Sequence, residues 1–268
     1  MIINTNVSSL ITRNNLRKTN DALQATMQKL SSGKRINSAS DDAAGLAIAT
    51  RMSSQITGMD TATRNANDGV SLLQTAESAM GSVSDILQRM RELAVQADNG
   101  TYSSGDKTNL QAEFSQLTKE IDHIATNTSF NGVKLLDGST ASVTLHISDA
   151  ASDTMGIDLQ NMSTASLSIG SLDISSDAQG ALTAIDTALD TVSTGRATLG
   201  SYQNRLGFTV DNLSTASTNL TSARSRIEDA DMAAESAEMT RNKILSQSSI
   251  AMLAQANQNP QQVLQLLQ

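Results

Sequence analysis

A seven-residue spacing of apolar side chains runs through the second half of the chain. The positions three residues after each of these, from Ala188 to Ala230, are mostly small. A helix with this pattern presents one narrow apolar seam, which other helices must cover. Two interpretations remain open from the pattern alone: one helix of an ordinary bundle, or a rod that stacks on copies of itself. The apolar series is Ile185, Val192, Leu199, Leu206, Leu213, Leu220 and Ile227.

The N-terminal segment carries the same spacing over a shorter stretch. Leu16, Leu23 and Leu30 repeat every seven residues. Asn20 lies between them at a seam position, where a polar side chain fixes helix register at some loss of stability. Gly33, followed by two cations, is typical of a helix end. An isolated helix of this length is marginal in water, so it needs a partner.

A much longer helix is predicted from about residue 43 to residue 98. Ser40, Asp41 and Asp42 precede it and supply oxygen atoms and negative charge for its first turn. Uncharged residues recur every seven positions along this stretch, and Asn99-Gly100 ends it. Such a helix is about 85 Å long at about 1.5 Å per residue, far beyond the usual length in globular proteins. This length indicates a rod.

The period changes in the middle of the chain. A third helix is predicted over about 105–128, and turn residues follow at Phe130-Asn131-Gly132 and Asp137-Gly138. Beyond them apolar and polar residues alternate, as in half-buried strands. We therefore predict a small region of β-hairpins over 130–175 and a return helix over about 177–227.

The C-terminal part of the chain is periodic as well. Ser176 with Gln179 forms a capping-box pattern that begins the return helix. A last amphipathic segment, with apolar residues such as Ile244 and Met252, ends in a glutamine-rich stretch from Ala254 to Gln268. The apolar stripes at the two termini are therefore incompletely covered, even when the terminal segments pair with each other. Other copies of the chain supply the missing cover most simply.

The predicted fold is mainly α, a long antiparallel helical rod or coiled coil with a small β-hairpin region in the middle of the chain. Residues 1–42 and 228–268 are expected to form a terminal coiled-coil domain, and residues 43–227 a rod domain. We expect assembly to use the apolar seams, whose residues are Leu16, Leu23, Leu30, Leu199, Leu206, Leu213, Leu220, Ile227, Ile244 and Met252.

Composition fits narrow helical seams better than a thick core. Only 2% of the residues are aromatic, and Trp and Cys are absent, so neither disulfides nor thiolate metal sites hold the chain together. A net charge of −8 argues against nucleic acid as a partner. No apolar run approaches the roughly 18 residues of a membrane span, and the N-terminus lacks the usual secretory signal. Composition by itself favours a cytoplasmic helical protein.

No residue pattern indicates catalysis. His123 and His146 each lie between inward-facing apolar neighbours and are expected to be exposed. Gly195 to Ser201 has the glycine spacing of a phosphate-binding loop, but serine stands where that loop requires lysine. Asp41-Asp42 is better explained by a helix start than by a metal site. We therefore expect no enzyme activity, no catalytic or metal-binding residue and no cofactor.

Five blocks of the chain are distinctive in sequence. They are LSSGKRINSASDDAAGLAIATRM (Leu30–Met52), DGVSLLQTAESAM (Asp68–Met80), LQRMRELAVQADNGT (Leu87–Thr101), FNGVKLLDG (Phe130–Gly138) and the closing stretch that begins with ARSRIEDADM at Ala223. Together they resemble bacterial flagellin, the filament subunit of the flagellum. Many flagellins carry large variable domains between the third helix and the return helix, where this chain has only residues 130–175. It therefore resembles the compact form, without large outer domains.

The resemblance implies a structural subunit that self-assembles into the helical flagellar filament for motility. In that family, residues like 1–42 and 228–268 are disordered in the free subunit and fold into concentric inner tubes on assembly. Subunits leave the cell unfolded through the flagellar type III path, with a chaperone bound to the C-terminal helices, and the filament is extracellular. The expected partners are other copies of the chain, the export chaperone, the filament cap and hook-associated proteins.

The resemblance also implies a face read by an animal innate-immune receptor, Toll-like receptor 5 (TLR5). Arg89, Leu93 and Glu113 carry this expectation, because Arg89 and Leu93 lie four apart and share a helix face. Under the alternative explanation, which we favour as the cause of the sequence, the same face serves subunit contact. The full set is Gln88, Arg89, Arg91, Glu92, Leu93 and Glu113.

Other readings remain open. Ser and Thr residues within 139–176 lie where family members are often O-glycosylated, although a Ser-rich turn region looks the same without sugar. Hook–filament junction proteins share the terminal blocks, but the intact block LQRMRELAVQ argues against that assignment. A receptor ligand or adhesin that acts as a monomer is a further alternative.

Overall fold

The computed structural model describes residues 5–150 and 152–266, with side chains up to residue 258. The side chains of the glutamine-rich stretch beyond that point therefore lie outside the described residues. Contacts divide the chain into two compact units, which we call the terminal unit (Met1–Ile56 with Thr218–Gln268) and the central unit (Thr57–Ser217). The prediction of a mainly helical fold with a small β-region is confirmed. The elements are α1 (Val7–Ser32), α2 (Ala43–Asp98), α3 (Ser104–Asn127), β1 (Ser129–Phe130), β2 (Val133–Lys134), β3 (Ser142–His146), β4 (Thr154–Asp158), α4 (Ala178–Glu228) and α5 (Met232–Leu266).

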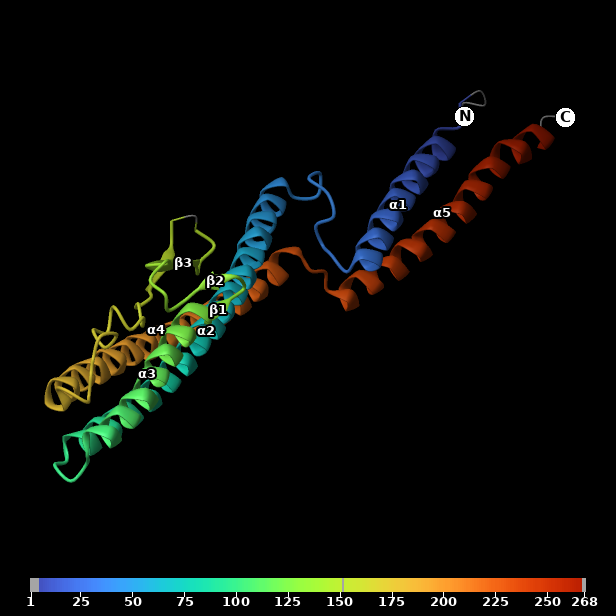
Figure 1. Cartoon of the computed structure of the whole chain (residues 1–268). Coiled ribbons are helices and arrows are strands. Elements are labelled where there is room, and N and C mark those ends of the chain that lie inside the picture. The colour runs from blue at the N-terminus through green and yellow to red at the C-terminus, as the bar shows by residue number, and fades with distance from the viewer. Residues whose placement is uncertain (1–4, 151, 267–268) are drawn as a thin grey trace. The chain divides into compact units, whose positions relative to one another are not determined.

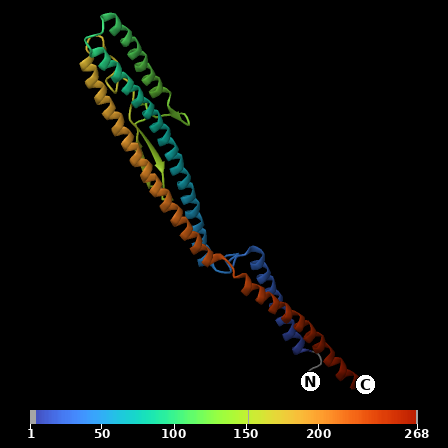
Figure 2. The same cartoon turned by 90° about the horizontal axis from the view of Figure 1, so that it is seen from below.

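The central unit has one apolar core between its helices and the β-region (Figures 1 and 2). The seven-residue series of α4 points into this core, where Ile185, Val192, Leu199 and Leu206 are all buried. Side chains of α2 and α3 meet them from the other helices, with Phe114 fully buried among them. The predicted seam is therefore real, and within this unit the chain itself covers it.

Two antiparallel hairpins make up the β-region. Asn131 and Gly132 join β1 to β2 with φ angles of +46° and +81°, the left-handed conformation that a tight two-residue hairpin turn requires. In the second hairpin Leu145 pairs with Met155. Leu145 also packs against Gly69 of α2, where an added Cβ would lie 2.2 Å from its Cδ1. Glycine at that position lets the hairpin approach the helix closely.

Beyond β4 the chain departs from the prediction. The alternating pattern predicts strands as far as residue 174, yet the described residues 159–177 form turns and no strand. Gln111 of α3 donates a hydrogen bond from Nε2 to the carbonyl of Leu172 (3.2 Å) and accepts one at Oε1 from the amide of Ile174 (2.8 Å). A side-chain amide thus takes the place of a partner strand, and the alternation reflects burial against helices.

The connector before α2 uses the predicted capping residues in two different ways. Asp42 caps the helix, because its Oδ1 accepts a hydrogen bond from the amide of Gly45 at 2.8 Å. Asp41 Oδ2 instead accepts from the amides of Asn37 (3.0 Å) and Ser38 (2.9 Å). These hydrogen bonds, that of Asn37 first, hold the pKa of Asp41 below its ordinary value. Asp41 therefore shapes the connector as a carboxylate.

The predicted capping box at the start of α4 is wrong. The residue that caps the helix is Asp177, whose Oδ1 accepts from the amide of Gly180 at 2.9 Å. Ser176 turns away, and its hydroxyl donates to the carbonyl of Asp173 at 3.4 Å. A carboxylate one residue further along is the better acceptor at the positive end of a helix, so it displaces the Ser176–Gln179 pattern.

The terminal unit pairs the two ends of the described chain. α1 and α5 lie side by side and antiparallel (Figures 1 and 2). Asn6 Nδ2 donates to the carbonyl of Ala256 at 2.7 Å near one end of the pair, and Lys29 Nζ lies 3.3 Å from Glu235 Oε1 near the other. α1 ends as predicted at Gly33, whose φ is +71°.

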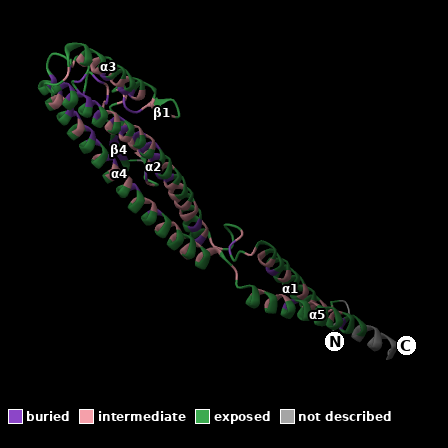
Figure 3. Cartoon of the chain, turned by 60° about the horizontal axis from the view of Figure 1, so that its bottom comes forward, coloured by how far each residue is buried: buried purple, intermediate pink, exposed green. Residues whose placement is uncertain are grey.

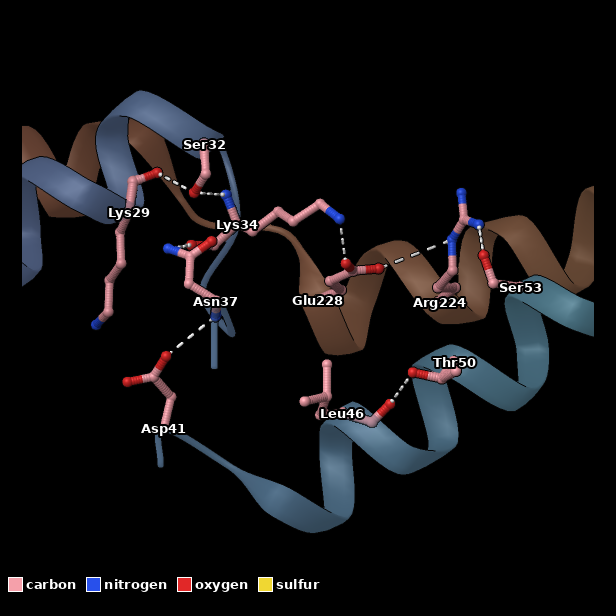
Figure 4. A network of polar contacts seen from close by, with 10 residues as sticks. All are labelled: Lys29, Ser32, Lys34, Asn37, Asp41, Leu46, Thr50, Ser53, Arg224 and Glu228. Carbon is pink, nitrogen blue, oxygen red and sulfur yellow. Dashed lines mark hydrogen bonds and ion pairs between the residues drawn. The ribbon is translucent and has the colours of Figure 1, made fainter. Parts of the chain in front are cut away.

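A group of charged and polar side chains joins the connector after α1 to the end of α4 (Figure 4). Glu228 is at its centre, with Lys34 Nζ against Oε1 at 2.5 Å and Arg224 Nε 3.9 Å from Oε2. Arg224 Nη1 also donates to Ser53 Oγ at 2.8 Å. Only 14% of the Glu228 side chain is exposed, so solvent screens these pairs less than surface pairs. We call Lys34, Ser53, Arg224 and Glu228 the Glu228 clasp.

Main-chain hydrogen bonds reinforce the Glu228 clasp. The amide of Arg35 donates to the carbonyl of Glu228 at 2.7 Å, and the amide of Ala230 donates to the carbonyl of Gly33 at 3.0 Å. These two bonds form a short antiparallel bridge between the connector after α1 and the connector before α5. The level at which α1 and α5 begin their pairing is therefore fixed by both backbone and side chains.

Replacing Gly33 by alanine tests the end of α1. Nothing lies within 4 Å of the added Cβ, so only the left-handed φ opposes it, and we expect G33A to lower the free energy of unfolding by about 1–2 kcal/mol. Gly81 in α2 is the matched control, because its added Cβ also meets nothing within 4 Å. G81A should raise stability by up to about 1 kcal/mol through helix propensity. Denaturant unfolding measures both changes in the free energy of unfolding. Changes of the same sign in G33A and G81A would contradict the left-handed end of α1 at Gly33.

Removing the charge at the centre of the Glu228 clasp should loosen the bridge between the connectors. We expect E228Q to lower the free energy of local opening by about 1–3 kcal/mol, because Lys34 and Arg224 lose a poorly exposed partner. Faster hydrogen exchange at the amides of Arg35 and Ala230 is the measurement. E238Q is the control: its exposed pair with Arg241 (2.8 Å) lies within one helix and should matter by at most about 0.5 kcal/mol. Unchanged exchange in E228Q would refute the role.

Candidate assembly surface

Large apolar side chains are exposed mainly in the terminal unit. Of the thirteen such side chains among the described residues, three belong to the central unit: Val95, Val133 and Phe208. Figure 3 shows the same division, with exposed and half-buried residues along α1 and α5 and buried ones gathered in the central unit. We call the other ten the terminal apolar surface. They are Val7, Leu10, Ile11, Met27, Ile48, Met232, Ile244, Leu245, Ile250 and Met252.

The contact between α1 and α5 relies on small and polar side chains. Among their described residues, the buried ones are Thr26 of α1 and Asn242 and Ala256 of α5. Ser246 of α5 also donates a hydrogen bond to Asn20 Oδ1 of α1 at 3.0 Å. Asn20, predicted as a polar seam residue, therefore serves to pair the helices. Because the pair buries so little apolar surface, its apolar side chains remain on outer faces that a second layer would normally cover.

The residues predicted as assembly seams divide into three groups. Leu199, Leu206 and Leu213 are buried within the central unit, so the expectation that they contact other copies is wrong. Periodicity alone cannot separate cover by the same chain from cover by another. Ile244 and Met252 are 60% and 63% exposed, which leaves them available for contact with other copies. The half-buried group is Leu16, Leu23, Leu30, Leu220 and Ile227.

The predicted receptor face contains a three-residue ion-pair network. Arg89 Nη2 lies 2.9 Å from Glu113 Oε1 of α3, and Arg89 Nη1 lies 2.9 Å from Glu92 Oε2 of its own helix. The hydrogen bonds to Glu113 and then Glu92 raise the pKa of Arg89 above its ordinary value. About half of the Arg89 and Glu113 side chains is exposed, at 50% and 47%. The network therefore presents fixed charges at the surface of α2 and α3.

Two other members of the predicted face lie elsewhere. Leu93 is 1% exposed, so it does not share the exposed face of Arg89 and that prediction is wrong. Four helical residues turn the chain by about 400°, and the remaining 40° or so moves Leu93 into the core. Arg91 Nε pairs with Asp186 Oδ1 of α4 at 2.7 Å. Gln88 is exposed. Sequence reasoning missed Asp186, which lies 95 residues away in the chain.

Hydroxyl groups within 139–176 differ in their availability for modification. Thr164 is buried, and its hydroxyl donates to the carboxylate of Asp122 at 2.8 Å. The hydroxyls of Ser139 and Ser175 donate to Asp137 and Asp173, each at 2.6 Å. Candidate positions for sugar are therefore the other exposed Ser and Thr residues of this region.

The residues considered for catalysis are scattered. His123 and His146 are exposed, as predicted. Gly195 lies in the interior of α4 and not in a loop. Within the described ranges no three His, Cys, Asp or Glu side chains gather as a metal site would require. Nor does any helix of the described residues combine the length and apolarity needed to cross a membrane.

Comparison with known proteins gives the same family at both ends of the chain. Residues 3–141 match the bacterial flagellin N-terminal helical region, and residues 182–267 match the bacterial flagellin C-terminal helical region. The flagellin of Listeria monocytogenes is 46% identical over 285 residues, which cover 100% of this chain and 99% of that protein. The crystal structure of Bacillus cereus flagellin is 40% identical with a TM-score of 0.52, covering 60% of this chain and 94% of that one.

A hook-associated assignment is not favoured. The structure of a putative flagellar hook-associated protein from Vibrio parahaemolyticus has a TM-score of 0.61 over 70% of this chain and all of that one, but it is only 16% identical. That likeness shows a shared fold alone, whereas the identity to flagellin extends over the whole chain. The near-complete coverage of a flagellin with 46% identity also agrees with the compact form, without a large variable domain. The chain belongs to the bacterial flagellin family.

Proposed function

We propose that this flagellin polymerises through its terminal segments, and that residues 1–42 and 228–268 form the core of the filament. Residues 43–227 then form the rod domain around that core. Membership of the family makes the chain a structural subunit of the bacterial flagellar filament, which is extracellular. What we propose is which surfaces join the subunit to the filament and in which order folding and joining occur.

The observation that carries the proposal is the terminal apolar surface. Nine of its ten large apolar side chains are exposed on α1 and α5, whose mutual contact is small and polar, and the tenth, Ile48, is exposed on α2. Complete burial of one such side chain stabilises an assembly by about 1.5–3 kcal/mol. Copies of the same chain supply this burial when their terminal units pack together, so assembly and completion of the terminal fold become one process. Exposed surface of this extent on a lone subunit otherwise promotes association without order.

The same feature bears on how subunits reach the growing filament. Two helices that bury little against each other are marginal in water, so the α1–α5 pair should open readily in the free subunit. An unfolded chain is suited to export through the narrow flagellar type III path, with a chaperone covering the apolar residues of the C-terminal segment. The filament cap and hook-associated proteins then meet the chain at the ends of the polymer.

Single acidic substitutions on the terminal apolar surface should weaken polymerisation. We expect I244D and M252D each to raise the subunit concentration needed for filament growth by about tenfold or more, because a carboxylate would be buried without a partner. I244L and M252L are the matched controls, because each keeps an apolar side chain of similar volume at the same position. Seeded growth followed by electron microscopy is the measurement.

Truncation gives the coarser test of the same proposal. Chains that lack residues 1–40 or 230–268 should remain monomeric while the central unit keeps its helical circular dichroism. Polymerisation of either truncated chain at the full-length rate would contradict assembly through the terminal segments.

We further propose that the Arg89–Glu92–Glu113 network is a recognition face for a receptor of the TLR5 type. Fixed exposed charges on two neighbouring helices support this, because such pairs give a partner specific positions to contact. Under the alternative, the same charges serve to orient neighbouring subunits, and binding by the receptor is incidental to that role. Exposed hydroxyls within 139–176 are proposed as sites for O-linked sugar, which intact-mass measurement of filaments would detect.

Charge reversal at Arg89 separates recognition from assembly. R89E should lower receptor activation by about tenfold or more while filaments still form, since the two exposed ion pairs of Arg89 add little to stability. R91E is the control, because Arg91 pairs with Asp186 on a different helix. Loss of filaments in R89E would show that the face serves subunit contact, and unchanged receptor activation would refute the recognition role.

A further inference from the structure

The methionines of the described chain fall into distinct exposure classes. Those that are fully buried all belong to the central unit: Met80, Met90, Met155 and Met162. Those that are exposed all belong to the terminal unit: Met27 at 50%, Met232 at 49% and Met252 at 63%. The exposed class thus lies wholly on the terminal apolar surface.

The three exposed methionines occupy both ends of the α1–α5 pair. Met27 and Met232 are two and three residues from Lys29 and Glu235, whose ion pair joins the helices at one end. Met252 is four residues before Ala256, where Asn6 of α1 is hydrogen-bonded at the other end. A chemical change at these side chains would therefore alter the surface along the length of the helix pair.

Oxidation changes a methionine side chain from apolar to polar. A peroxide transfers one oxygen atom to the thioether sulfur: its O–O bond breaks, an S–O bond forms, and sulfur loses two electrons. Hydrogen peroxide is reduced to water in the same step. The sulfoxide accepts strong hydrogen bonds, so its burial in an apolar contact without a partner is unfavourable.

We propose that Met27, Met232 and Met252 form a redox-sensitive modification site that controls entry of the subunit into the filament. Peroxide converts their thioethers to sulfoxides in the free subunit and prevents incorporation. Incorporation shields the same thioethers, so the finished filament resists the oxidant. This inference rests on the proposed function, because it requires that neighbouring copies cover the terminal apolar surface.

The test begins with purified full-length subunits treated with hydrogen peroxide. Peptide mass spectrometry should find sulfoxide first at Met27, Met232 and Met252, while Met80 and Met90 of the same molecules stay unmodified and serve as internal controls. The oxidised subunits should need a concentration about tenfold or more higher than untreated subunits for seeded growth. Treatment with a methionine sulfoxide reductase should restore growth.

Leucine variants assign the effect to particular sulfurs. The triple variant M27L, M232L and M252L keeps apolar side chains of similar volume without a thioether, so it should polymerise equally well before and after peroxide. M239L is the matched control, because Met239 is a half-buried residue of α5. This variant should remain as sensitive as the natural chain. If the untreated triple variant fails to polymerise, the oxidised natural chain decides the question. Its growth should return after treatment with the reductase.

The outcomes distinguish the inference from the proposed function. Equal oxidation rates of the three methionines in subunits and in filaments would mean that the terminal apolar surface is not covered, and the proposed function would fail. Protection in filaments together with normal polymerisation of oxidised subunits would leave the proposed function intact and overturn the inference. Persistent sensitivity of the triple leucine variant would overturn it as well.

Discussion

The structure depends on one constraint: two helices alone have too little mutual surface to bury the apolar side chains that make them amphipathic. In the central unit α2, α3 and α4 meet the β-region, so apolar residues such as Leu73 and Ile185 lose all contact with water. The terminal unit has no such third layer among its described residues. It pairs α1 with α5 through Thr26, Asn242 and Ala256 and leaves the larger side chains outside. One chain thus contains a self-sufficient fold and an incomplete one.

Polar contacts mark the difference between the units. In the central unit they complete the fold: Gln111 satisfies the backbone of a segment without a strand partner, and Asp122 accepts from both the amide and the hydroxyl of the buried Thr164. In the terminal unit they set position instead. The Glu228 clasp and the bridge beside it fix where the two helices begin to pair, while contributing little apolar burial. Within the terminal unit, polar groups therefore set the register of the helix pair.

Sequence reasoning succeeded where a repeated pattern decides the outcome. The spacing of seven identified the buried side of α4, because many apolar side chains repeat on one face and a single exception does not change that face. It failed where one distant group supplies the answer. Nothing near residues 172–174 indicates that Gln111 will bond their backbone, and nothing near Arg91 indicates Asp186. It also failed where two neighbouring residues can cap the same helix. Asp177, one residue after Ser176, caps α4 in its place.

The repeated apolar pattern also predicts the assembly surface in outline. Incomplete cover of the two termini follows from the pattern itself, and Ile244 and Met252 are exposed. The pattern cannot say which molecule covers a seam, so Leu199 and Leu206 were assigned to contacts between copies although their own chain buries them. Likewise the shared face of Arg89 and Leu93 ignored the rotation that accumulates over four residues, and that rotation moves Leu93 into the core.

The antiparallel pairing of α1 with α5 has a kinetic consequence. Asn6 and Ala256 are 250 positions apart, and Lys29 and Glu235 are 206 apart, so these contacts close very long loops. Such distant pairings form slowly, whereas the helices of the central unit associate over shorter separations. Whichever end of the chain is made first, α1 has no partner within the chain until α5 is present. The α1–α5 pair is consequently the last part of the chain to find its structure.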